Sequence, residues 1–155
     1  MFRTGGYLVL LNPYRESLRN DALVQTIGLL DQILGACPDP VSEVTALLGE
    51  TNWRANLVGA AAALRGELKE PPILNALWRA IERPSWASPQ LAVASRHLDE
   101  TFLDRAPQHI RSSNPKTAAA IAFLADLPSS IEDTEQGARI ADRWQMAMLE
   151  MWPPT

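Results

Sequence analysis

A pattern that recurs three times constrains the fold of this chain more than any other feature. Each copy starts with a short polar segment and continues into an alanine-rich run, and the copies start at residues 51–54, 84–87 and 113–116. Trp53 and Trp86 lie 33 residues apart, and Trp86 and Lys116 lie 30 residues apart. A period in this range is typical of stacked helical hairpins. Such repeats more often present a binding surface than carry out chemistry.

Apolar spacing and cap residues predict helices along nearly the whole chain. The first apolar stripe steps by four, three and four residues, at Leu23, Ile27, Leu30 and Leu34. Three further starts combine a cap residue with a proline at the first helical position, at Asp39-Pro40, Ser88-Pro89 and Asn114-Pro115. Thr51 or Asn52 caps the helix that we expect to end at Gly66. The sequence therefore predicts an all-α fold.

Three segments are less regular. Pro107 falls inside the helix expected near residues 101–110, where a proline removes a backbone hydrogen bond. Ser130 and Asp133 have the spacing of a capping box for the last helix. Residues 7–11 are the one run that could be a strand, and an isolated strand has nothing to pair with.

The first copy resembles HEAT repeats. In that family the second helix of each hairpin often opens with an acidic or small polar residue, then an aliphatic-Arg pair, then alanines and leucines. Asn52-Trp53-Arg54, with leucines and alanines over 57–64, follows this pattern. The second copy has Ala87 where the arginine is expected, and the third has Lys116 near that position without an aromatic residue. The resemblance covers residues 39–125.

The resemblance implies a single domain over residues 1–155, built as a short right-handed α-solenoid of about three hairpins. The implied hairpins pair 39–49 with 52–66, 71–83 with 88–98, and 100–111 with 114–125. Helices at 16–36 and 131–152 would then cap the two ends. Residues 126–155 hold six acidic and two basic residues, which accounts for the whole net charge of −4. An acidic end helix suits a cap that stops the stack from growing.

Charge and composition exclude several function classes. Nucleic-acid binding usually requires a basic stripe over a whole domain, and this chain has a pI near 5.2. No apolar run is long enough to span a bilayer, and the run at 7–11 lacks a secretory cleavage site. With Cys37 as the single cysteine, we expect no internal disulfide and no multi-cysteine zinc site. We expect a cytoplasmic protein that is a monomer or a weak dimer.

Candidate catalytic and metal-binding residues are few. His97 and His109 stand near Asp99, Glu100 and Asp104. The spacing argues against a metal site, because residues two apart point to different faces of a helix. We expect neither a metal nor a cofactor. The alternative is a small α-helical enzyme whose site is assembled across helices from Asp99, Glu100 or His97.

The leading hypothesis is a protein-binding module. If the second helices line the concave side of a solenoid, six residues would share one mildly basic surface there, namely Trp53, Arg54, Trp86, Gln90, Arg96 and Lys116. Tryptophan and arginine are enriched in binding hot spots, and the cations would attract an acidic protein partner. An immunity-type protein bound to a toxin, or an adaptor, has these properties.

Overall fold

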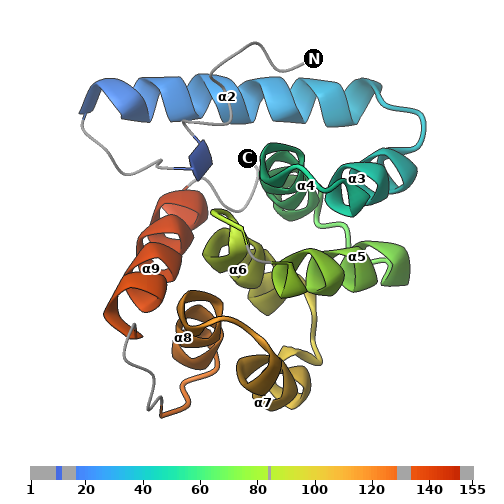
Figure 1. Ribbon diagram of the computed structural model, residues 1–155. Helices are drawn as coiled ribbons and strands as arrows, with labels where there is room; N and C mark the ends of the chain where they lie inside the picture. The colour runs from blue at the N-terminus through green and yellow to red at the C-terminus, as the bar shows by residue number, and fades with distance from the viewer. Residues whose placement is uncertain (1–9, 12–16, 84, 129–133, 151–155) are drawn as a thin grey trace.

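The computed structural model describes residues 10–11, 17–83, 85–128 and 134–150, and this part of the chain is all-α (Figure 1). The all-α prediction is thus confirmed. Leu10 and Leu11, from the run considered as a strand, have helical backbone. Eight helices follow: α2 (Ser17–Ala36), α3 (Pro40–Gly49), α4 (Trp53–Gly66), α5 (Pro71–Glu82), α6 (Ser88–Leu98), α7 (Phe102–Ser112), α8 (Pro115–Leu124) and α9 (Thr134–Glu150).

Three of the predicted helix starts have the expected caps. The side chain of Asp39 accepts a hydrogen bond from the backbone N–H of Ser42 at 3.1 Å. Asn52 caps α4 by accepting from Arg54 N–H at 3.0 Å, and Asn114 caps α8 by accepting from Thr117 N–H at 3.0 Å. Each bond satisfies a backbone donor that has no partner inside the helix.

Other predicted details differ. Ala87, rather than Ser88, occupies the cap position of α6, and the Ser88 hydroxyl instead lies 3.3 Å from the Arg83 carbonyl oxygen. At the end of α4 the left-handed residue is Glu67, at φ 50°, and not Gly66. Pro107 lies within a continuous α7 on its exposed side, where water can satisfy the freed carbonyl group. Ser130 and Asp133 lie outside the described residues.

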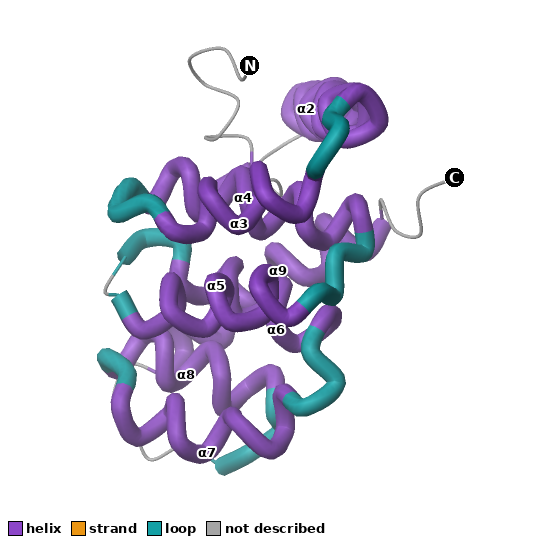
Figure 2. The backbone as a smooth tube through the Cα atoms, turned by 90° about the vertical axis from the view of Figure 1, so that its right-hand side faces the viewer, coloured by secondary structure: helices purple, strands orange, loops and turns teal. Residues whose placement is uncertain are grey.

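Consecutive helices pack in pairs that are stacked on one another. The pairs are α3 with α4, α5 with α6, and α7 with α8, and the stack runs from top to bottom in Figure 1. Between pairs, α3 contacts α5, α4 contacts α6, and α6 contacts α8. Figure 2 shows the same stack after a quarter turn. Packing therefore follows the order of the chain, with α6 in the middle.

The alanine-rich runs are the contact surfaces between these helices. Residues 60–63 of α4, the alanines of α6 and residues 118–120 of α8 are all buried. Small side chains allow helix backbones to approach closely, so that three helices can stack side by side. Gly59 continues this pattern in α4, where an added Cβ would lie 3.0 Å from Leu48 of α3.

The two outer helices pack differently. Helix α9 lies along α8 and α6, and the buried Trp144 donates its indole N–H to the Leu10 carbonyl oxygen at 2.6 Å. Helix α2 crosses the top of the stack and contacts α4 (Figure 1). Arg65 of α4 bonds Asp31 of α2 through two contacts, Nη2 to Oδ2 at 2.7 Å and Nε to Oδ1 at 2.9 Å. Helix α2 therefore packs on the stack mainly through α4.

Within the described residues, no helix is long and apolar enough to cross a membrane.

We predict that Gly137→Ala will destabilise the protein by about 1–3 kcal/mol, as other overpacked contacts do. An added Cβ would overlap the backbone carbonyl of Lys116, which cannot move without displacing α8. Gly28→Ala in α2 is the matched control, because a Cβ there meets no atom within 4 Å. That change should stabilise the helix by about 0.5–1 kcal/mol. Urea unfolding measures both, and a neutral Gly137→Ala would show that α8 and α9 are not in close contact.

Trp144→Ala should lower the free energy of unfolding by about 3–5 kcal/mol, because it empties a fully buried site and leaves the Leu10 carbonyl without its donor. The expectation that Trp144 is buried is confirmed. Met146→Ala, two residues away on the exposed side of α9, should change stability by less than about 0.5 kcal/mol. A loss below about 1 kcal/mol for Trp144→Ala would mean that α9 is not docked.

Candidate functional site

Trp86 and Lys116 form the most exposed aromatic site among the predicted residues. Trp86 precedes α6 and is 68% exposed. The Lys116 ammonium, at the start of α8, lies 5.2 Å from the centre of the indole ring. A cation at this distance is attracted to the face of the ring, which helps to hold the side chain in one position. The neighbouring Ser85 side chain accepts the Ala87 N–H at 3.2 Å and orders the loop.

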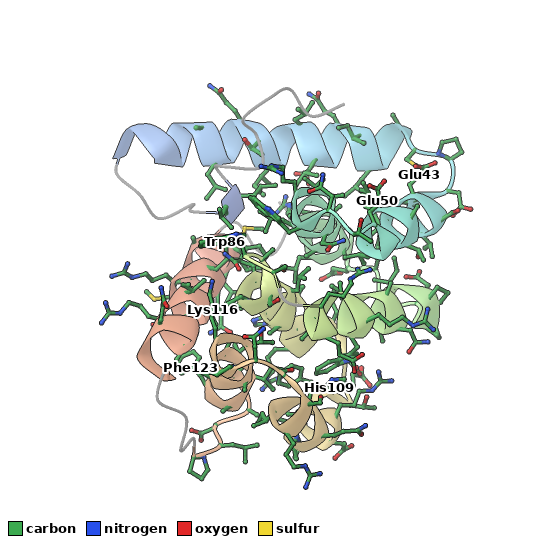
Figure 3. All side chains as sticks on the ribbon, viewed as in Figure 1. Glu43, Glu50, Trp86, His109, Lys116 and Phe123 are labelled. Atoms are coloured by element: carbon green, nitrogen blue, oxygen red, sulfur yellow. The ribbon has the colours of Figure 1, made fainter. Side chains whose placement is uncertain are left out.

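Phe123 is a further exposed aromatic residue on the same side of α8. It lies seven residues after Lys116, which is two helical turns, and its side chain is exposed. Figure 3 labels the three residues one below the other on the ribbon. We call Trp86, Lys116 and Phe123 the Trp86 surface. The pattern of the repeats predicted Trp86 and Lys116, whereas Phe123 was overlooked because it lies in an otherwise buried apolar run.

Trp53 and Arg54 occupy the corresponding start of α4. Trp53 is half-buried and packs against the core. The exposed Arg54 guanidinium lies over the Trp53 ring, 4.7 Å from its centre. The Arg54 guanidinium is thus exposed at the surface, while much of the Trp53 indole ring packs against the core.

Gln90 does not lie on an accessible surface. It is 2% exposed, and its side-chain amide donates to the Leu11 carbonyl oxygen at 3.2 Å. Arg96 is half-buried, and its Nε donates to the Leu124 carbonyl oxygen at 3.1 Å. The physical reason is that Leu11 packs against Gln90 and that α9 packs against both α6 and α8. The structure therefore does not join all six predicted residues into one patch.

Asp99, a member of the enzyme alternative, is the centre of a buried network. Its Oδ2 accepts the Trp78 indole N–H at 2.8 Å, and its Oδ1 accepts the Thr101 backbone N–H at 2.8 Å and hydroxyl at 2.7 Å. Burial raises the pKa of Asp99, but these hydrogen bonds and the Arg105 charge outweigh it, and the pKa is lowered overall. An ionised carboxylate with both oxygens engaged is suited to joining helices rather than to transferring protons.

The two histidines also make packing contacts. His97 Nε2 of α6 lies 3.1 Å from the Gln145 side-chain oxygen of α9. The His109 ring stacks on Trp78 with 4.2 Å between centres, and its Nδ1 lies 3.3 Å from Glu82 Oε1. Burial lowers the pKa of both histidines, and a nearby arginine adds to this effect in each case. In the part of the chain that the structure describes, no three His, Cys, Asp or Glu side chains are grouped to hold a metal ion.

A groove of about 840 Å³ opens where α2, α3 and α4 meet. Most of its lining is apolar, and Glu43, Asn52 and Arg54 supply polar groups. No pattern in the sequence indicated this groove, because residues of three separate helices line it. One available signal was Ile33, an apolar residue beside rather than within the buried stripe of α2.

Neither a protein-family model, nor a curated protein, nor a solved structure shows a significant match to this chain.

We predict that stability will fall as the pH drops below about 6.5, the ordinary pKa of histidine. Because the pKa values of His97 and His109 are lowered on folding, the unfolded chain binds protons more readily below that pH, and protonation favours unfolding. The loss should level off below the folded pKa values. Urea unfolding between pH 5 and 7.5 measures this slope.

A double variant, His97→Gln with His109→Phe, is the control for that prediction. It keeps a polar group facing Gln145 and an aromatic ring facing Trp78. Its stability should vary less with pH in this window than that of the wild type. An unchanged slope in the variant would show that other groups carry the pH dependence.

Proposed function

We propose that this protein is a non-enzymatic binding module of the HEAT-like α-solenoid type, in which the three stacked helix pairs act as repeats. The sequential packing of α3 to α8 supports this architecture. In this proposal α2 and α9 cap the repeats, and the module acts as a monomer in the cytoplasm without a metal or cofactor. Its role is that of an immunity-type or adaptor protein.

The partner in this proposal is another protein, bound through the Trp86 surface. The single observation that carries the proposal is the exposed Trp86 ring, held beside the Lys116 ammonium. A large aromatic side chain fixed in place loses little conformational freedom on binding and can bury much apolar area. Residues 51–116 carry nine basic and six acidic residues, so an acidic partner is favoured.

The binding surface that we propose differs from the six-residue surface expected from the sequence. Gln90 and Arg96 are engaged inside the helix stack, so the proposed contact excludes them. Arg54 lines the groove beside α2 and α3, and the proposed contact does not include it either. The enzyme alternative gains no support from Asp99, because hydrogen bonds to Trp78 and Thr101 occupy both carboxylate oxygens.

The proposal predicts that a Trp86→Ala/Lys116→Glu variant will lose the partners that the wild type retains. Loss of a hot-spot residue typically weakens binding by 2 kcal/mol or more, or about 30-fold. Tagged wild type and variant are used to capture proteins from the source cells, and captured proteins are then compared by mass spectrometry.

Leu103→Ala is the matched control, because Leu103 is an exposed apolar residue on α7 outside the Trp86 surface. The control should retain the same partners as the wild type. Recovery of identical partners with all three proteins would contradict the proposal. Circular dichroism checks that each variant is folded.

A further inference from the structure

The groove between α2, α3 and α4 has the shape of a binding site for one more helix. Its floor is the face of α4 formed by Ala55, Val58 and Ala62, which follow one another at helical spacing of three and four residues. Two of these are alanines, which let an incoming helix approach closely. The walls are the C-terminal half of α2 and the facing side of α3.

The apolar surface continues beyond the groove. Ile33 of α2 lines the groove and is 37% exposed. Leu29, also 37% exposed, lies one helical turn before it on the same flank of α2. A small apolar molecule inside the groove would leave Leu29 uncovered, whereas a helix lying along α2 would cover both residues. This continuity favours a helical occupant over a small ligand.

The charges at the groove specify the polar side of that occupant. Arg54 contributes a cation from the start of α4, and its guanidinium is oriented by contact with the Trp53 ring at 4.7 Å. Glu43 contributes an anion from the wall formed by α3. A complementary helix therefore carries an acidic side chain that reaches Arg54 and a basic one that reaches Glu43.

We propose that this groove binds an amphipathic α-helix of another protein, with apolar residues at i, i+3, i+4 and i+7 and an acidic residue paired with Arg54. Helices of this kind bind to grooves between helices through their apolar face. The groove uses none of the residues of the Trp86 surface, so this site and the proposed function can succeed or fail separately.

Two synthetic, fluorescently labelled helices of about five turns test the proposal. Both helices carry leucines at i, i+3, i+4 and i+7. At the position facing Arg54, the acidic helix has a glutamate and the charge-reversed helix has a lysine. Fluorescence anisotropy measures their affinity for the wild type and three variants. The wild type should bind the acidic helix at least about tenfold more tightly than the charge-reversed helix, because the glutamate pairs with Arg54.

Two of the variants lie in the groove. Ile33→Asp should weaken binding of the acidic helix at least about tenfold, because it places a charge on the apolar wall. Arg54→Glu should reverse the preference, so that the lysine helix binds more tightly. Because both side chains are exposed or partly exposed, these changes should leave the fold intact, as circular dichroism can check.

Val24→Asp is the matched control for Ile33→Asp. Val24 is an apolar residue of the same helix, 53% exposed, on the flank away from the groove. The affinity of the Val24→Asp variant for the acidic helix should stay within about twofold of that of the wild type, as for other surface substitutions away from a contact. The proposal would be overturned if Val24→Asp and Ile33→Asp weakened binding of the acidic helix equally. It would also be overturned if the wild type bound neither helix, or if Arg54→Glu still preferred the acidic helix.

Other occupants give distinct results in further measurements. Sedimentation that shows a concentration-dependent dimer of the wild type, absent in Ile33→Asp, would assign the groove to a second copy of this chain. A small apolar molecule retained by the purified protein in native mass spectrometry, and lost in Ile33→Asp, would assign it to a small ligand. Either result would overturn the proposal of a partner helix.

Discussion

The close packing of small side chains around α6 is the interaction on which the rest of the structure depends. Residues 88–95 of α6 are all buried, and the helix contacts α4, α5, α8 and α9. Buried alanines on α4, α6 and α8 allow these helices to approach closely, because an alanine side chain is only a methyl group. A large side chain at these positions would force the stack apart, since a packed interior cannot absorb the extra volume without strain.

The two outer helices show what this packing leaves open. Helix α9 closes against α8 and α6 through a glycine and a buried tryptophan, so it removes that side of the stack from solvent. Helix α2 is attached mainly to α4 and leaves a groove beside α3. Exposed apolar surface therefore remains around Trp86 and in the groove beside α2.

Buried polar groups join several of the helices to one another. Asp99 links α5 to the turn before α7 through Trp78 and Thr101, and His109 of α7 stacks on the same Trp78. A buried carboxylate is tolerated here because hydrogen bonds replace the water it has lost. A cluster of acids and histidines in the sequence is equally compatible with such a network and with an active site, and only the positions of their neighbours distinguish the two.

The sequence by itself determined the all-α class and most helix boundaries, because caps, prolines and apolar spacing act over three or four residues. It also indicated Trp86 and Lys116, because they stand at the starts of the second and third copies of the repeated pattern. The tertiary structure alone decided which residues are accessible. Gln90 is buried against Leu11, 79 positions away, and Trp144 bonds Leu10, 134 positions away. The groove likewise depends on the angle between α2 and α3, which non-local packing sets and which no short stretch of sequence specifies.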